Sequence, residues 1–176
     1  MKTFLKIHGK VICVLGLVFL LVACSSVGQT QITQPKTGQI RPNTTVILSV
    51  IPPKNASDQE EVTDVIRRLK SQLFGRLMSE GLFKQVFHPG ETADYRMDVQ
   101  LLETNKVSQG ARLFLGVFAG KNSLKAKVSL YEERSQSLVT SFDVTGKSAS
   151  HPLSSENDLD DAIREFVDQI ILTLNN

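Results

Sequence analysis

The sequence of 176 residues contains no tryptophan, three histidines and two cysteines. Cys13 and Cys24 both lie near the N-terminus, so no disulfide can link parts of the remaining chain. Without further cysteine, and without two histidines at helical spacing, no metal site is predicted. The G-x-S-x-G pattern of a hydrolase nucleophile is also missing. We therefore expect a fold held by packing alone, with no catalytic residues, no cofactor and no metal, and thus not an enzyme.

The chain also has no apolar run long enough for a permanent transmembrane helix. Val11 to Ala23 is free of charge for 13 residues, whereas spanning a bilayer takes about 20. Lys2, Lys6 and Lys10 precede this run, and a small residue closes it. A charged leader followed by a short apolar core is typical of a secretory signal peptide. The alternative is an uncleaved N-terminal membrane anchor.

The end of this leader resembles the lipobox of bacterial lipoproteins in all four positions, Leu21-Val22-Ala23-Cys24. The resemblance implies that residues 1–23 are removed as a signal peptide and that Cys24 carries a diacylglyceryl group. Two acyl chains already hold a protein stably on a membrane. The residue after the lipidated Cys influences sorting in this family: an Asp there retains the lipoprotein at the inner membrane. This chain has Ser25 at that position, so it resembles the lipoproteins that are sorted to the outer membrane. We expect a lipid-anchored outer-membrane protein that faces the periplasm.

The charge balance argues against nucleic acid as a partner. Removing residues 1–23 leaves 17 Lys and Arg against 18 Asp and Glu, so the mature chain is not basic. Charge is nevertheless uneven, because residues 106–147 hold seven basic and three acidic side chains. This region can meet an anionic glycolipid or an acidic protein. The alternative is a solvated sheet face whose charges pair across strands.

Two segments follow the predicted cleavage site. Residues 24–43 are polar, show no apolar period, and are predicted to form the lipidated N-terminus and a flexible tether. Residues 44–176 form the predicted periplasmic α/β domain. It opens with a β-branched stretch at 44–53 that is typical of an interior strand. An amphipathic helix follows, with Val62, Ile66, Leu69, Leu73 and Leu77 as its stripe, and then a short edge strand, "KQVF".

Three alternating segments and a second helix complete the domain. Residues 94–102, 123–131 and 137–145 alternate between apolar and polar, and "EERSQ" is predicted to join the last two as a hairpin that places Lys127 opposite Ser141. The closing helix has the stripe Leu159, Ala162, Ile163, Phe166, Ile170 and Leu174. The predicted fold class is α+β, a two-layer sandwich with two amphipathic helices on one face of a mostly antiparallel sheet of about four strands.

The stretch "GARLFLGVFAGKNS", at 110–123, is unusual in combining apolar residues with glycines. It does not fit a phosphate-binding loop, because its glycines are too close together and Asn122 follows the lysine. One interpretation buries the stretch as core, and the other exposes it as a contact loop for a partner or for lipid. The residues of this candidate contact loop are Arg112, Leu113, Phe114, Leu115, Gly116, Val117, Phe118 and Gly120.

Several segments together resemble a known family. "GLFKQV", "ADYRMDVQLLE" and residues 110–148 are similar to the bacterial lipoprotein family known as domain of unknown function 4410. The matching positions are Arg112, Gly116, Gly120, Leu124, Val128 and Gly146, whereas the turn "EERSQ" departs from the pattern. The family name assigns no activity. We expect a non-enzymatic accessory or scaffold component of a cell-envelope complex, with another envelope protein as partner; the alternative is a lipid or glycolipid binding module.

Overall fold

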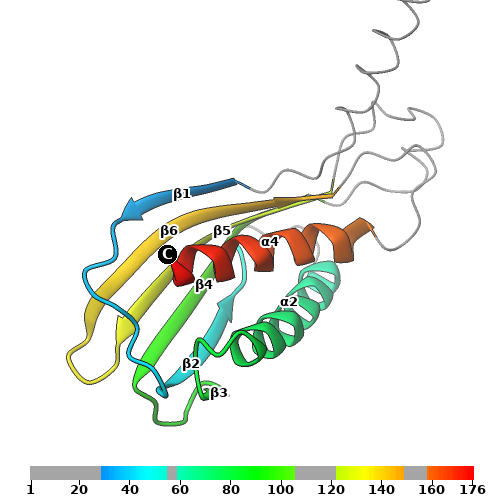
Figure 1. Ribbon diagram of the computed structural model, residues 1–176. Helices are drawn as coiled ribbons and strands as arrows, with labels where there is room; N and C mark the ends of the chain where they lie inside the picture. The colour runs from blue at the N-terminus through cyan, green and yellow to red at the C-terminus, as the bar shows by residue number, and fades with distance from the viewer. Residues whose placement is uncertain (1–28, 55–58, 106–121, 149–157) are drawn as a thin grey trace, which may run out of the picture.

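The computed structural model describes residues 29–54, 59–105, 122–148 and 158–176. Strands and helices follow one another along the chain as a mixed α+β arrangement (Figure 1). The elements are β1 (Gln29–Gln34), β2 (Thr45–Ile51), α2 (Gln59–Ser79), β3 (Gln85–Phe87), β4 (Tyr95–Asn105), β5 (Ser123–Glu132), β6 (Ser137–Lys147) and α4 (Asp158–Asn175).

One sheet of six strands, in the order β1-β6-β5-β4-β2-β3, forms the first layer. The predicted number of about four strands is therefore too low, whereas the mostly antiparallel direction is correct, because three of the five strand pairings among the described residues are antiparallel. Strand β2 runs parallel to both β3 and β4. Helix α2 carries the chain back to the end of the sheet at which β2 began, and residues 88–94 return it to the same end between β3 and β4. The predicted edge strand "KQVF" is confirmed as β3.

Strand β1 corrects the prediction of a flexible tether at 24–43. Residues Gln29–Gln34 pair antiparallel with β6 at one edge of the sheet. The strand has a single apolar residue, Ile32, and this side chain is 61% exposed. Strand β1 therefore has no alternation of apolar and polar residues from which it could be predicted. Backbone pairing and polar contacts hold it instead, including Thr33 Oγ1 donating to the carbonyl of Ser141 over 2.9 Å.

The two described helices, α2 and α4, lie on one face of the sheet, as Figure 1 shows, and form the second layer. The core lies between the layers. The sequence correctly predicted the stripe of α4, whose six residues are all buried: Leu159, Ala162, Ile163, Phe166, Ile170 and Leu174. In α2 the buried set is Val62, Val65, Leu69, Leu73 and Leu77, so Val65 takes the place predicted for Ile66. Ile66 is partly buried at the margin of the core.

The β5–β6 hairpin exists as predicted, but its register differs by two residues. Lys127 lies opposite Asp143 rather than Ser141. The turn, 133–136, has four residues instead of five, and a bulge between Leu130 and Tyr131 adds Val139 as an extra residue on β6. Beyond the bulge, the faces of the strands are unchanged because a shift of two residues preserves the alternation of side chains.

Candidate functional site

The site residues predicted from the sequence lie outside the described residues. Cys24 and the candidate contact loop, from Arg112 to Gly120, belong to segments 1–28 and 106–121, for which no geometry is described. The interpretation of the loop as core or as contact surface therefore stays open. Within the described ranges, three other places combine polar side chains with partial burial: the open face of the sheet, the side of α2 that faces β3, and a hollow between α2 and α4.

No described helix covers the face of the sheet opposite α2 and α4. On this open face the lysines of the predicted basic hairpin alternate with acids. Lys127 lies opposite Asp143 on β6, and Lys125 lies opposite Glu103 on β4. Opposite charges at neighbouring strand positions compensate one another. The described part of the hairpin therefore has the character of a solvated, charge-paired sheet face, and offers little local excess of positive charge.

A half-buried ionic cluster occupies the same face where β4 meets β5. The guanidinium of Arg96 lies 4.8 Å from the ring centre of Tyr131, and its Nε lies 3.3 Å from Asp98 Oδ2. Burial raises the pKa of Asp98, the positive charge of Arg96 opposes the rise, and Glu133 adds to it. Among the described residues, Arg96 Nε and Glu133 Oε2 are buried without a hydrogen-bond partner.

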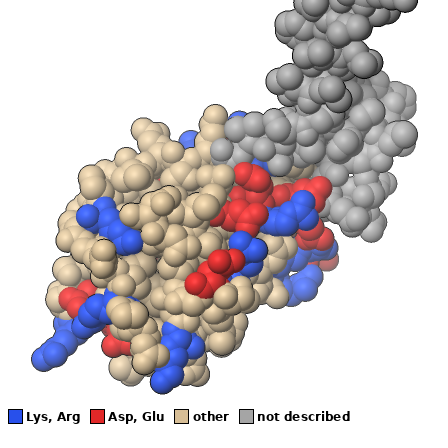
Figure 2. Space-filling model, viewed as in Figure 1, with Lys and Arg blue, Asp and Glu red and all other residues tan. Residues whose placement is uncertain are grey.

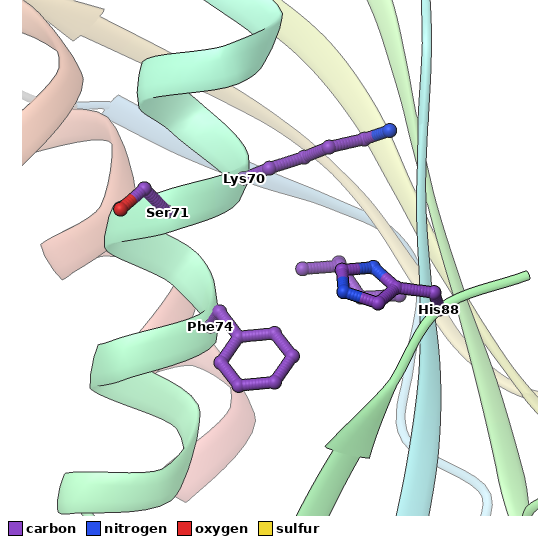
Figure 3. A pocket seen from close by; sticks show the side chains of 5 residues that line it. Lys70, Ser71, Phe74 and His88 are labelled. Carbon is purple, nitrogen blue, oxygen red and sulfur yellow. The ribbon is translucent and has the colours of Figure 1, made fainter.

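A second place of interest is a pocket of about 220 Å³ between α2 and the β2–β3 edge. Leu48, Lys70, Ser71, Phe74 and His88 line it. Figure 3 shows Lys70 extending from α2 above His88, with the ring of Phe74 below and directed toward His88. The rings of Phe74 and His88 stack with centres 5.7 Å apart and planes 24° apart. Leu48, only 3% exposed, connects this pocket to the core.

Most basic residues of α2 are already paired with acids. Arg68 Nη1 lies 3.0 Å from Asp160 Oδ1 of α4, and Arg76 Nη2 lies 2.9 Å from Asp168 Oδ1. Arg67 pairs with Asp64 one turn earlier. Figure 2 shows acidic and basic side chains next to one another over the two helices.

A larger hollow between α2 and α4, of about 420 Å³, is lined by several members of these pairs, including Arg76, Asp160 and Asp168. Its charges are therefore largely compensated within the chain. The hollow offers an incoming ligand no free charge comparable to that of Lys70.

Sequence reasoning missed the pocket beside α2. It did not single out Lys70, Phe74 or His88 as site residues. A signal was nevertheless present, because Ile66 and Phe74 are apolar, eight residues apart, and lie on the flank of the main stripe. Residues at this spacing share one side of a helix, so they widen the apolar face toward β3, with Lys70 between them.

Two features that would mark other kinds of site are absent from the described ranges. No group of three or more His, Cys, Asp or Glu side chains in them is arranged to hold a metal ion. Neither described helix is long and apolar enough to cross a bilayer.

Comparison with known proteins identifies the family. The model of the family described as "Domain of unknown function (DUF4410)" matches residues 27–152, more than half of the chain, so the chain belongs to this family. This confirms the resemblance seen in the sequence. The match begins before β1, in agreement with the place of that strand in the fold. A search of curated proteins finds no match.

Solved structures of PelC share the fold of this chain at low sequence identity. The PelC dodecamer from Paraburkholderia phytofirmans has a TM-score of 0.57 and 12% identity, and the alignment covers 84% of this chain and 97% of that one. A variant of the same protein gives a TM-score of 0.56 and 13% identity over the same shares. A lipoprotein from Neisseria meningitidis has a TM-score of 0.44 and 18% identity, over 73% of this chain and 99% of that one.

Proposed function

We propose that this member of the DUF4410 family is a non-enzymatic scaffold of the bacterial cell envelope, anchored through lipid on Cys24 to the outer membrane. The lipobox-like residues Leu21 to Cys24 support the anchor, and Ser25 supports the choice of membrane. In this proposal the folded domain faces the periplasm and organises a complex by binding other protein chains. Its first partner is a second copy of the same chain.

The observation that carries this proposal is the open edge of β1. This strand lies at one end of the sheet and pairs on one side only, with β6, among the described residues. An unpaired strand edge is a template for another strand, and natural proteins usually block such an edge with Lys or Pro. The six residues of β1, "QTQITQ", contain neither, and Ile32 is 61% exposed.

The comparison with PelC adds a second argument. That protein, which shares the fold, is described as a dodecamer. The same arrangement of strands and helices is therefore compatible with assembly of many copies. In this chain, pairing of β1 with a strand of a neighbouring copy would satisfy the free backbone groups of its outer edge and cover Ile32.

The proposal is tested by the mass of the full-length lipoprotein, extracted from membranes in a mild detergent and measured by sedimentation. We expect an assembly of several chains for the wild type and a smaller species for Ile32→Lys, because a lysine on the edge strand opposes pairing. The matched control is Met78→Lys. Met78 is also a large exposed side chain, 43% accessible, but lies in the last turn of α2. The control should keep the mass of the wild type.

A wild type that is monomeric at every concentration would overturn self-assembly. A photo-crosslinking residue at position 32, introduced in intact cells, then separates the remaining cases. Capture of another copy supports the scaffold as proposed. If the purified protein is monomeric and position 32 instead captures one defined envelope protein, the edge of β1 binds that partner. This protein would then be an accessory subunit.

A further inference from the structure

The pocket between α2 and the β2–β3 edge contains an uncompensated positive charge. Helix α2 carries four basic residues, and three of them, Arg67, Arg68 and Arg76, form ion pairs. Lys70 forms none with any residue that the structure describes. The guanidinium groups of Arg68 and Arg76 are engaged with α4, whereas Lys70 lies at the pocket on the side of β3 (Figure 3).

The pocket beside this lysine is largely apolar and built from separate parts of the chain. Phe74 comes from α2 and His88 follows β3, and their rings stack at 5.7 Å. Leu48, on β2, is only 3% exposed and forms the floor toward the core. Apolar side chains with a few convergent polar groups are the usual lining of small-molecule sites. Lys70 and the imidazole of His88 are the polar groups on this side of α2, and both can donate hydrogen bonds, whereas the hydroxyl of Ser71 points away from them in Figure 3.

The size of the pocket limits what can enter. A cavity of about 150 Å³ accepts benzene, and sites for drug-sized ligands begin at about 300 Å³. The volume of about 220 Å³ lies between them. It therefore suits one aromatic ring or one short acyl segment, together with a single polar head.

We propose that this pocket binds a small amphiphilic anion: a carboxylate or phosphate joined to a short acyl chain or a single ring. The anionic head lies at Lys70 Nζ with His88 beside it, and the apolar part lies against Phe74 and Leu48. An ammonium group attracts a carboxylate or a phosphate as a point charge. Lys70 therefore selects a negatively charged head group without distinguishing these two anions. This site is separate from the β1 edge, and it goes beyond the scaffold role without depending on it.

The test uses the full-length lipoprotein in nanodiscs, with empty nanodiscs as the blank, and saturation-transfer NMR to detect bound probe. The probes are hexanoate, hexyl phosphate, neutral 1-hexanol and inorganic phosphate. We expect at least one of the two amphiphilic anions to bind about tenfold more tightly than hexanol, because a hydrogen bond to a charged partner has that strength. Inorganic phosphate should not displace it, since phosphate has no apolar part.

Three variants locate the binding. Lys70→Gln should weaken binding of the anionic probe about tenfold and leave binding of hexanol unchanged. Because unfolding would weaken binding of both probes, this selectivity excludes loss of folding as the cause. Phe74→Leu should weaken the anion and hexanol alike. Lys127→Gln, on the opposite face of the sheet, removes the same charge and should change neither.

The proposal is overturned if hexanol binds as well as both anions, if Lys70→Gln leaves anion binding intact, or if no probe gives saturable binding. Equal binding of hexanoate and hexyl phosphate supports recognition of charge alone. A clear preference for one of them supports the proposal and identifies the head group, separating a fatty-acid source from a phospholipid source.

Discussion

Gly146 of β6 lies directly against the backbone of Ala162 in α4. A Cβ placed on Gly146 would stand 2.4 Å from the carbonyl oxygen of Ala162 and 2.6 Å from Cβ of Phe166. Atoms that are not bonded do not approach so closely, so the missing side chain sets the distance between helix and sheet. The packing of Ala162 and Phe166, two predicted core residues of α4, against the sheet therefore requires a glycine at position 146 of β6.

The first prediction follows from this contact. Gly146→Ala should destabilise the protein by about 1–3 kcal/mol, the usual effect of extra atoms in a packed core. The matched control is Gly75→Ala in α2, where a new Cβ meets nothing within 4 Å. Because alanine is the better helix former, this control should stabilise by about 0.4–1 kcal/mol. Denaturant unfolding of both variants checks the pair, and equal effects would show that α4 can move away from β6.

This contact shows which parts of the fold are readable from the sequence. The alternation along β4 and β5 and the stripe of α4 predicted the inward residues correctly, because each pattern reflects burial on one side of a single element. The closeness of Gly146 to Ala162 reflects two elements at once. The similarity to the family pattern marked Gly146, but only the structure supplies the reason.

The parts that could not be predicted have different physical causes. Strand β1 is held by backbone pairing, and its one apolar residue, Ile32, faces solvent. The parallel direction of β2 depends on where α2 returns the chain. The hairpin register depends on the extra residue Val139, and a shift of two residues leaves the polar alternation intact. The pocket beside Lys70 needs three separated segments brought together, which no local pattern encodes.

The second prediction concerns pH and the cluster around Asp98. Its pKa is raised above the ordinary value of 3.8, chiefly by burial. The folded state therefore binds this proton more tightly than the unfolded state. Stability falls as pH rises from 3.8 to the raised folded pKa, and the cost persists at neutral pH. Asp98→Asn, which cannot ionise, should gain stability relative to the wild type over this interval.

Denaturant midpoints across the acidic range, converted to free energies of unfolding, measure this difference. Ser49→Ala is the control, because Ser49 lies opposite Asp98 on β2 and does not titrate. Its difference from the wild type should not vary with pH. If the gain of Asp98→Asn instead shrinks as pH rises, the attraction of Arg96 outweighs burial and the pKa of Asp98 is lowered rather than raised.

The third prediction concerns the anchor. Cys24→Ala should abolish lipid attachment and block processing at this position, because the thiol is the only group there that can carry the diacylglyceryl chain. Metabolic labelling with a palmitate analogue should mark the wild type alone. Cell fractionation should recover the processed, membrane-bound form for the wild type and not for the variant. Ser25→Ala retains the thiol and serves as the labelled control. Equal labelling of Cys24→Ala would contradict the lipoprotein assignment.

The fourth prediction separates the two interpretations of the apolar stretch at 110–123. If it is core, Phe114→Ala and Phe118→Ala should each cost about 3–5 kcal/mol. That is a large share of the total of about 5–15 kcal/mol for a domain. If it is a contact loop, the same changes should leave the melting temperature nearly unchanged and abolish capture of a partner or lipid. Phe118→Ser sharpens the contrast, since a buried hydroxyl adds its own cost.

Melting must be measured on a chain that includes residues 29–43 as well as 44–176, because β1 pairs with β6 and its removal would itself expose a strand edge. Leu102→Ala, on an exposed side chain of β4, is the control for a general loss of apolar surface and should melt close to the wild type. A large loss at both phenylalanines eliminates the contact loop. Unchanged melting together with unchanged capture eliminates both interpretations, since a segment that neither supports the core nor binds a partner would tolerate every one of these substitutions.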